Sequence, residues 1–231
     1  MCNRDFASKQ LNMIQNRISL SANNAGREAR SITLIGASKG QPSSLIREFH
    51  NAGLNSLGEN YLQEGLKKTA ELSDLPLQWH FIGHIQSNKT KQIAENYDWV
   101  HTIDRIKIAT RLAQQAPSNK SINALIQLNI DEEDSKSGVN LKDASSLANQ
   151  IAQLDNIQLR GYMLLPKPRH SFEEQRKPFA VAREALELTN QRYGLHLDQL
   201  SMGMSKDLEA AISEGGTMIR VGRDLFGDRP G

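Results

Sequence analysis

Eight short apolar runs, separated by amphipathic stretches, constrain the fold of this chain more than any other feature of its sequence. The runs begin near residues 32, 56, 79, 99, 122, 157, 199 and 217, and helical patterns occupy residues 42–52, 60–71, 88–95, 104–116, 141–153, 171–192 and 207–214. Parallel strands need crossovers of about a dozen residues, which helices supply. The alternation therefore predicts an α/β fold, a TIM-type (β/α)8 barrel, with an open doubly wound sheet as the alternative.

A further helical pattern, from about Phe6 to Leu20, precedes the first apolar run. It predicts a helical segment within residues 1–30 that packs on the outside of the barrel. The 231 residues suit one large core, and no stretch rich in Pro, Gly or Ser divides them. We therefore predict one domain over residues 1–231, with no length left after the eighth strand for a second domain.

The composition argues against nucleic acid and membranes as partners. The 28 Lys and Arg nearly balance the 26 Asp and Glu, and the net charge of +2 gives no basic footprint. No apolar stretch reaches the roughly 18 residues of a membrane helix, and the charged N-terminus is unlike a signal peptide. The only cysteine, Cys2, cannot close an internal disulfide. These features predict a soluble, cytoplasmic protein.

The first apolar run ends at Lys39, which puts an amine at the barrel end where active sites form. A lysine at a strand end often only lays its stem on apolar surface, so Lys39 alone indicates little. Two loops near the end of the sequence strengthen the indication of a functional site. The loop "SMGMSKD" offers the Ser205 hydroxyl and free amides at a helix start, and "RVGRD" offers Gly222 and the amides of residues 222–224.

Each of these loops is also typical of an ordinary helix cap. Together, however, they follow the seventh and eighth strands, which carry the usual phosphate site of such barrels. A lysine that faces a phosphate site is the layout that pyridoxal 5′-phosphate (PLP) requires, with an amine at one end and an anchor at the other. A sugar-phosphate enzyme, whose lysine would meet a substrate carbonyl, is an alternative at this point.

Five motifs in order resemble one known family along nearly the whole chain. They are "GASKGQP" (36–42), "GENYLQE" (58–64), "WHFIGHIQSNKTKQI" (79–93), "SMGMSKDLEAAI" (201–212) and "GTMIRVGRDLFG" (216–227). The family is that of the pyridoxal 5′-phosphate homeostasis proteins, also called the YggS or proline-synthase-co-transcribed type. The resemblance implies a barrel like the N-terminal domain of alanine racemase, without that enzyme's second domain.

The resemblance also implies a set of cofactor contacts in this sequence. Lys39 would hold PLP as an aldimine, and Ser205 with the backbone of Gly222 and Arg223 would hold its phosphate. Arg220 would face the pyridine nitrogen. Because arginine offers only donors, the ring nitrogen beside it must be unprotonated, which makes the ring a poor electron sink.

Three further positions, Asn60, His80 and Met163, would line the pocket of the cofactor ring by the same resemblance. His84 stands where the family commonly has a proline, which affects loop detail. The spacing of His80 and His84 is that of two metal ligands on a helix, but a strand that runs into a turn does not put them on one face. We predict no metal site.

Two carboxylates at strand ends, Glu59 and Asp104, are candidates for paired acid–base chemistry. Acids in such places also cap helices and pair with arginines such as Arg105, and nothing in the sequence selects the catalytic role. The stretch "SKSG" (135–138) is a candidate for an additional anion loop, or a solvated loop.

The resemblance implies a monomeric protein of intracellular PLP (vitamin B6) and amino-acid homeostasis, which buffers PLP or delivers it to apo-enzymes. No catalytic turnover is expected, because the implied fold lacks the second domain that helps enclose the site of alanine racemase. An amino-acid racemase that uses PLP is the alternative.

Overall fold

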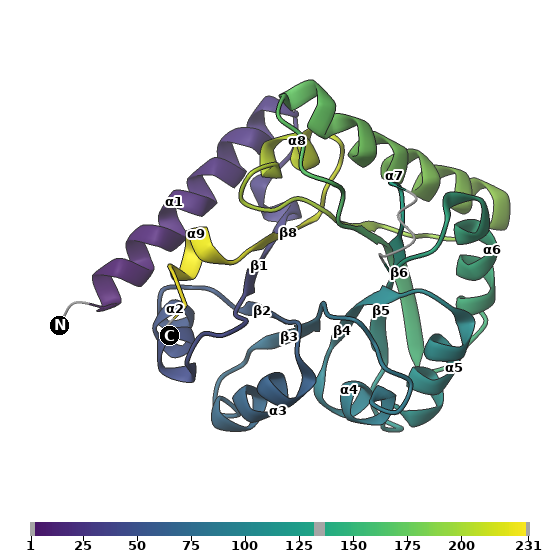
Figure 1. Cartoon of the computed structure of the whole chain (residues 1–231), viewed down its shortest axis with the longest axis horizontal. Coiled ribbons are helices and arrows are strands. Elements are labelled where there is room, and N and C mark those ends of the chain that lie inside the picture. The colour runs from purple at the N-terminus through teal and green to yellow at the C-terminus, as the bar shows by residue number, and fades with distance from the viewer. Residues whose placement is uncertain (1–2, 132–136, 230–231) are drawn as a thin grey trace.

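The structure, a computed structural model, describes residues 3–131 and 137–229. Eight parallel strands close into a barrel in chain order, and β8 pairs with β1 (Figure 1). The strands are β1 (Thr33–Ala37), β2 (Ser56–Glu59), β3 (Gln78–Phe81), β4 (Trp99–Ile103), β5 (Ile122–Leu128), β6 (Ile157–Leu164), β7 (Gln199–Ser201) and β8 (Met218–Val221). The predicted TIM-type barrel is confirmed.

Helices follow the strands around the outside of the barrel, as Figure 1 shows. They are α2 (Ser43–Asn51), α3 (Leu62–Glu71), α4 (Thr90–Asn96), α5 (Ile106–Gln115), α6 (Leu141–Ile151), α7 (Phe172–Tyr193), α8 (Leu208–Ser213) and α9 (Arg223–Phe226). A helix α1 (Asn3–Asn24) and a 3₁₀ turn η1 (Ala29–Ser31) precede β1. Each predicted helix occurs within a few residues of its predicted bounds, and α1 is longer at both ends.

The first helix, α1, runs along the outside of the barrel beside α2, α9 and α8 (Figure 1). Its buried side chains recur at the spacing of one helical face: Ala7, Leu11, Ile14, Ile18 and Ala22. Burying a side chain of the size of leucine or isoleucine contributes roughly 1.5–3 kcal/mol, so this stripe accounts for the docking of α1. The helix thereby covers the part of the barrel where the chain closes on itself.

Alternation along the strands decides which side chains enter the barrel. On β3, Trp79 and Phe81 point outward into the layer between sheet and helices, so His80 between them points into the barrel. On β8, Met218 and Arg220 point inward by the same rule. The interior therefore combines an apolar layer with the polar side chains of His80 and Arg220. The apolar layer consists of Ile35, Trp99, Leu125, Met163 and Met218.

The closure of the barrel brings three loops together at the carboxyl ends of the strands. Because β1 lies between β8 and β2, the loop with Lys39 has the loop of residues 222–224 on one side and the loop with Asn60 on the other. The β2 and β3 loops approach closely, since a Cβ on Gly83 would lie 1.9 Å from the carbonyl oxygen of Asn60. Only glycine admits this approach.

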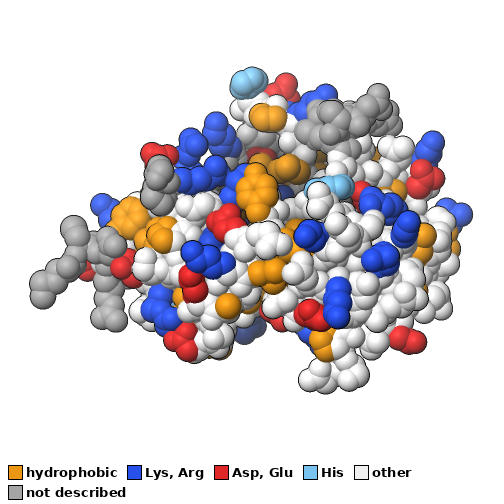
Figure 2. Space-filling model, turned by 60° about the horizontal axis from the view of Figure 1, so that its bottom comes forward, with side chains coloured by type: hydrophobic (Ala, Val, Ile, Leu, Met, Phe, Trp, Pro, Cys, Tyr) orange, Lys and Arg blue, Asp and Glu red, His pale blue; other side chains and the backbone are white. Residues whose placement is uncertain are grey.

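Charged side chains are mixed in sign over the face in Figure 2, where Lys and Arg are interspersed with Asp and Glu. Such a mixture produces no extended field of one sign. None of the helices in the described part of the chain is long and apolar enough to cross a membrane.

Candidate functional site

The residue that follows Lys39 fixes the position of the loop that carries this lysine. The backbone N–H of Gly40 donates a hydrogen bond to Oε1 of Glu64, 2.5 Å away on α3. The Lys39 amine lies 4.5 Å from the ring centroid of Tyr61, a side chain that is itself exposed. A cation over an exposed aromatic ring gains roughly 0.5–1 kcal/mol, so this contact holds the amine only weakly.

A buried ion-pair cluster fixes the loop on the other side of Lys39. Nζ of Lys68 donates to Oε1 of Glu59 at 2.7 Å, to Oε1 of Glu64 at 2.6 Å and to the carbonyl oxygen of Ser38 at 2.6 Å. The Ser38 hydroxyl also donates to Glu59, over 2.6 Å. The Lys68 side chain is 5% exposed and that of Glu59 is 0% exposed, so water does not screen this pair.

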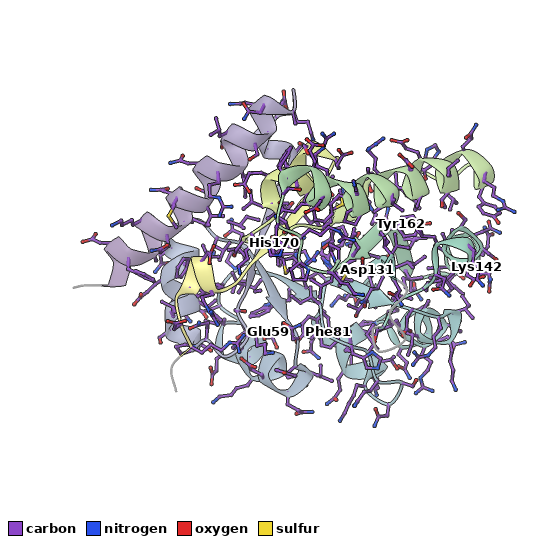
Figure 3. The ribbon with its side chains drawn as sticks, turned by 45° about the horizontal axis from the view of Figure 1, so that its top comes forward. Glu59, Phe81, Asp131, Lys142, Tyr162 and His170 are labelled. Carbon is purple, nitrogen blue, oxygen red and sulfur yellow. The ribbon has the colours of Figure 1, made fainter. Side chains whose placement is uncertain are left out.

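Burial and partners act in opposite directions on the two carboxylates of the cluster. Burial raises the pKa of Glu59 above its ordinary value, and the hydrogen bonds from Lys68 and Ser38 offset only part of this effect. Glu64 is less buried; burial acts to raise its pKa, but the hydrogen bonds from Lys68 and Gly40 lower it overall. Figure 3 labels Glu59 on the side of the barrel that α3 covers. Sequence reasoning missed Lys68, although its i,i+4 spacing from Glu64 is a signal for an ion pair.

The two predicted phosphate loops offer donors that have no partner in the described parts of the chain. The Ser205 hydroxyl makes no hydrogen bond there, and the amides of residues 222–224 donate to no carbonyl. A Cβ on Gly222 would meet the carbonyl oxygen of Ala37 at 3.5 Å, an ordinary contact. Packing within the protein therefore does not explain this glycine, whereas a ligand against the backbone would. These donors fit a phosphate group.

Arg17, on α1, contacts both loops, and no local pattern in the sequence indicates this. Its Nη2 donates to the carbonyl oxygen of Ser205 at 2.8 Å, and its Nε donates to Oε1 of Glu209 at 2.9 Å. Its Nη1 lies 4.0 Å from Oδ2 of Asp224. The N-terminal helix therefore supports the predicted phosphate site as well as covering the barrel.

Arg220 lies inside the barrel and is nearly inaccessible to water. It donates from Nη1 to Ser201 Oγ at 2.6 Å and from Nη2 to the carbonyl oxygen of Leu164 at 2.9 Å. Burial lowers the pKa of Arg220 to about 10. The guanidinium is therefore still cationic at neutral pH, and its donors are fixed in direction.

A cavity of about 300 Å³ opens at the carboxyl ends of the strands from β2 to β6. Asn60 and Met163, both predicted as ring-pocket residues, line this cavity together with Thr102 and Gln127. The volume lies at the lower end of the range of small-molecule sites. The structure thus brings Asn60 and Met163 to one cavity.

His80, which the resemblance places in the ring pocket, is not among the residues that line this cavity. Its ring is 0% exposed, and it lies among the interior side chains, 3.0 Å from His101 and stacked on Trp99. His80 turns inward on β3 between outward-facing neighbours, so its ring packs in the barrel interior. His84 is exposed in the following turn, and its Nδ1 lies 3.0 Å from Ser137 Oγ.

The other polar residues that the sequence suggested do not lie together at one site. Asp104 pairs with its neighbour Arg105 over 2.8 Å, whereas Glu59 belongs to the Lys68 cluster, so the two carboxylates do not form an acid–base pair. Residues 135 and 136 of the candidate anion loop, and Cys2, lie outside the described residues. Among the described side chains, no group of three or more His, Cys, Asp or Glu is arranged to hold a metal ion.

Comparison with known proteins gives this arrangement a class. Residues 15–230 match the family described as alanine racemase, N-terminal domain. The alanine racemase of Corynebacterium glutamicum shares the fold, with a TM-score of 0.68 over 96% of this chain and 62% of that one, at 16% identity. The protein is a barrel of the alanine racemase N-terminal-domain class.

Closer relatives narrow the class. A pyridoxal phosphate homeostasis protein of Pseudomonas aeruginosa is 51% identical over 214 residues, which cover 92% of this chain and 91% of that protein. The structure of PipY of Synechococcus elongatus, with PLP bound, has a TM-score of 0.84 at 35% identity and covers 96% of this chain and 100% of that one. This chain belongs to the pyridoxal phosphate homeostasis proteins.

Proposed function

We propose that this protein binds PLP and serves in intracellular PLP (vitamin B6) and amino-acid homeostasis. The observation that carries the proposal is the grouping of Lys39 on the β1 loop with donors on the neighbouring β8 loop and at Ser205 that have no partner among the described residues. The names of the relatives, and the PLP in the PipY structure, support the same ligand.

The roles of the residues follow from their chemistry. PLP supplies an aldehyde that condenses reversibly with a primary amine, with loss of water. Lys39 is the amine in our proposal, and the Ser38–Glu59–Lys68 contacts hold its backbone in place. Ser205 and the amides of Gly222 and Arg223 would donate to the phosphate.

The remaining contacts concern the ring. Arg220 would donate to the ring nitrogen, a position that admits only an acceptor. Asn60 and Met163, which line the cavity, would border the ring. His80 is fully buried and does not line that cavity, and we do not include it among the ligand contacts.

The protein in this proposal buffers or delivers PLP and turns over no substrate. An unprotonated ring nitrogen withdraws electrons poorly, so the Arg220 donors disfavour removal of a proton from a bound amino acid. The likeness to the solved alanine racemase of Corynebacterium glutamicum is one of fold, at 16% identity, and that structure gives the racemase alternative no residue-level support. A monomeric state, a cytoplasmic location and transient contact with apo-enzymes complete the proposal.

Borohydride reduction of the PLP-loaded protein, followed by peptide mass analysis, tests the proposal directly. We expect one adduct, on Lys39, and none in Lys39→Ala; Lys142→Ala, which changes an exposed lysine on α6, should keep the adduct. An adduct on another lysine in the wild type would refute the assignment. Racemisation of an amino acid that disappears in Lys39→Ala would favour the enzyme instead.

A further inference from the structure

A chain of hydrogen bonds crosses the barrel interior from Arg220 to the amino-terminal ends of the strands. Arg220 Nη1 donates to Ser201 Oγ, which lies 2.9 Å from Nδ1 of His101. His101 Nε2 lies 3.0 Å from Nδ1 of His80, and His80 Nε2 lies 3.2 Å from Oε1 of Gln78, the exposed first residue of β3. The chain thus joins β8 and β7 to β4 and β3 on the opposite side of the barrel.

The first member of this chain decides its direction. A guanidinium has only donors, so Ser201 Oγ accepts from Arg220, and the hydroxyl proton of Ser201 is available to Nδ1 of His101. His101 then carries its proton on Nε2 and donates to Nδ1 of His80. His80 in turn donates from Nε2 to the side-chain amide oxygen, Oε1, of Gln78. In every one of these hydrogen bonds, the donor is the group nearer to Arg220.

The opposite direction is unfavourable for two reasons. If Nδ1 of His101 donated to Ser201, the hydroxyl proton of that fully buried serine would have no acceptor among the residues that the structure describes. The reversed dipoles would also turn their positive ends toward the Arg220 cation. Both costs are largest in a dry interior, and Ser201, His101 and His80 are all fully buried there.

Neutral groups surround the buried charge of Arg220. Its hydrogen-bond acceptors are the Ser201 hydroxyl and the carbonyl oxygen of Leu164. No carboxylate within residues 3–131 and 137–229 forms an ion pair with it, and Asp207 acts on it only at a distance. Burial lowers the pKa of His80 to about 3, and burial first, then the charges of His80 and Arg220, hold the pKa of His101 well below its ordinary value.

We infer that Ser201, His101 and His80 are positioning residues whose aligned dipoles solvate the Arg220 cation in place of a carboxylate. A carboxylate partner would cancel the charge of the arginine, whereas neutral dipoles leave it available to an anionic or acceptor ligand at the mouth of the barrel. The inference rests on the proposed function, because PLP is the ligand that meets this charge. His80 thereby has a role behind the site instead of on its wall.

The tautomers can be measured in the wild-type protein without PLP. Nitrogen-15 NMR on labelled histidine, with each signal assigned by substitution, distinguishes the Nε2–H tautomer from the Nδ1–H tautomer and from the cation. We expect His80 and His101 both to be Nε2–H from about pH 8 to about pH 5. A signal of the Nδ1–H form or of the cation from either residue in that range would overturn the inference. This result does not depend on whether the protein binds PLP.

A pair of substitutions at His101 tests the effect on ligand affinity. His101→Gln keeps an acceptor toward Ser201 and a donor toward His80, whereas His101→Leu keeps neither. We expect the dissociation constant for PLP to rise roughly tenfold or more in His101→Leu and to stay within about twofold of the wild type in His101→Gln. Thr90→Val, which removes a buried hydroxyl from α4 outside the barrel interior, is the control for general destabilisation. Equal affinities in the two His101 variants would refute the positioning role.

Discussion

Replacing Lys68 by methionine should destabilise the protein more than most single substitutions. Methionine fills the space of the lysine stem, so the main change is the loss of the ammonium that donates to Glu59, Glu64 and the carbonyl oxygen of Ser38. Removing one partner of a buried ion pair leaves the other charge uncompensated, at a cost of about 3–5 kcal/mol. For a chain of this length, such a loss lowers Tm by about 6–20 °C.

The cost of Lys68→Met should also depend on pH, because Glu59 can take up a proton. Burial already raises the pKa of Glu59, and loss of the neighbouring cation raises it further. A carboxyl whose pKa is raised in the folded state contributes stability at low pH and loses that contribution as the pH rises through the folded-state value. The deficit of the variant relative to the wild type should therefore be smaller at about pH 5 than at about pH 8.

Urea unfolding at the two pH values, monitored by circular dichroism, measures this deficit. The matched control is the double variant Lys68→Met/Glu59→Gln, in which neither charge remains; it should be more stable than Lys68→Met alone at about pH 8. A deficit below about 1 kcal/mol, or a double variant no more stable than the single one, would contradict the role of the cluster. If Lys39 reacts with PLP as proposed, that reaction should also slow in Lys68→Met, since the cluster holds the backbone on both sides of Lys39.

Three other changes have expected outcomes. Ser205→Ala should cost about 1.5–3 kcal/mol of PLP binding, roughly tenfold or more in the dissociation constant by fluorescence titration, because the hydrogen bond proposed between Ser205 and the phosphate dianion is lost while the backbone donors remain; an unchanged constant would remove Ser205 from the proposed site. Gly65→Ala should lower Tm even though alanine favours helices, since its Cβ would fall 1.8 Å from the Tyr97 hydroxyl oxygen; a Tm equal to that of the wild type would show that Tyr97 moves at no cost. Acid should destabilise the protein progressively from about pH 6.5 downward, because the folded-state pKa of His80 is about 3, that of His101 is also well below its ordinary value, and the unfolded state takes up these protons first; His80→Gln should flatten that part of the stability profile in part, and an unchanged profile would contradict a buried neutral His80.

The sequence by itself determined the order of the elements and the places of the main ligand candidates. Hydrophobic period and strand-ending residues are local properties, so eight runs and their crossovers predicted the barrel. Lys39, Ser205 and Gly222 were found in the same way, because a strand end in a parallel barrel is by definition at the mouth. The family motifs added the interpretation of these residues as PLP contacts.

Only the tertiary structure decided which side chains support that site. Arg17 meets the Ser205 loop across 188 residues of sequence, and His101 meets Ser201 across 100. Such contacts depend on how the barrel closes and on which way each side chain turns, and neither is written in a local pattern. His80 illustrates the difference: the family resemblance implied a place in the ring pocket, but its neighbours on β3 face outward, and alternation turns its ring into the barrel interior.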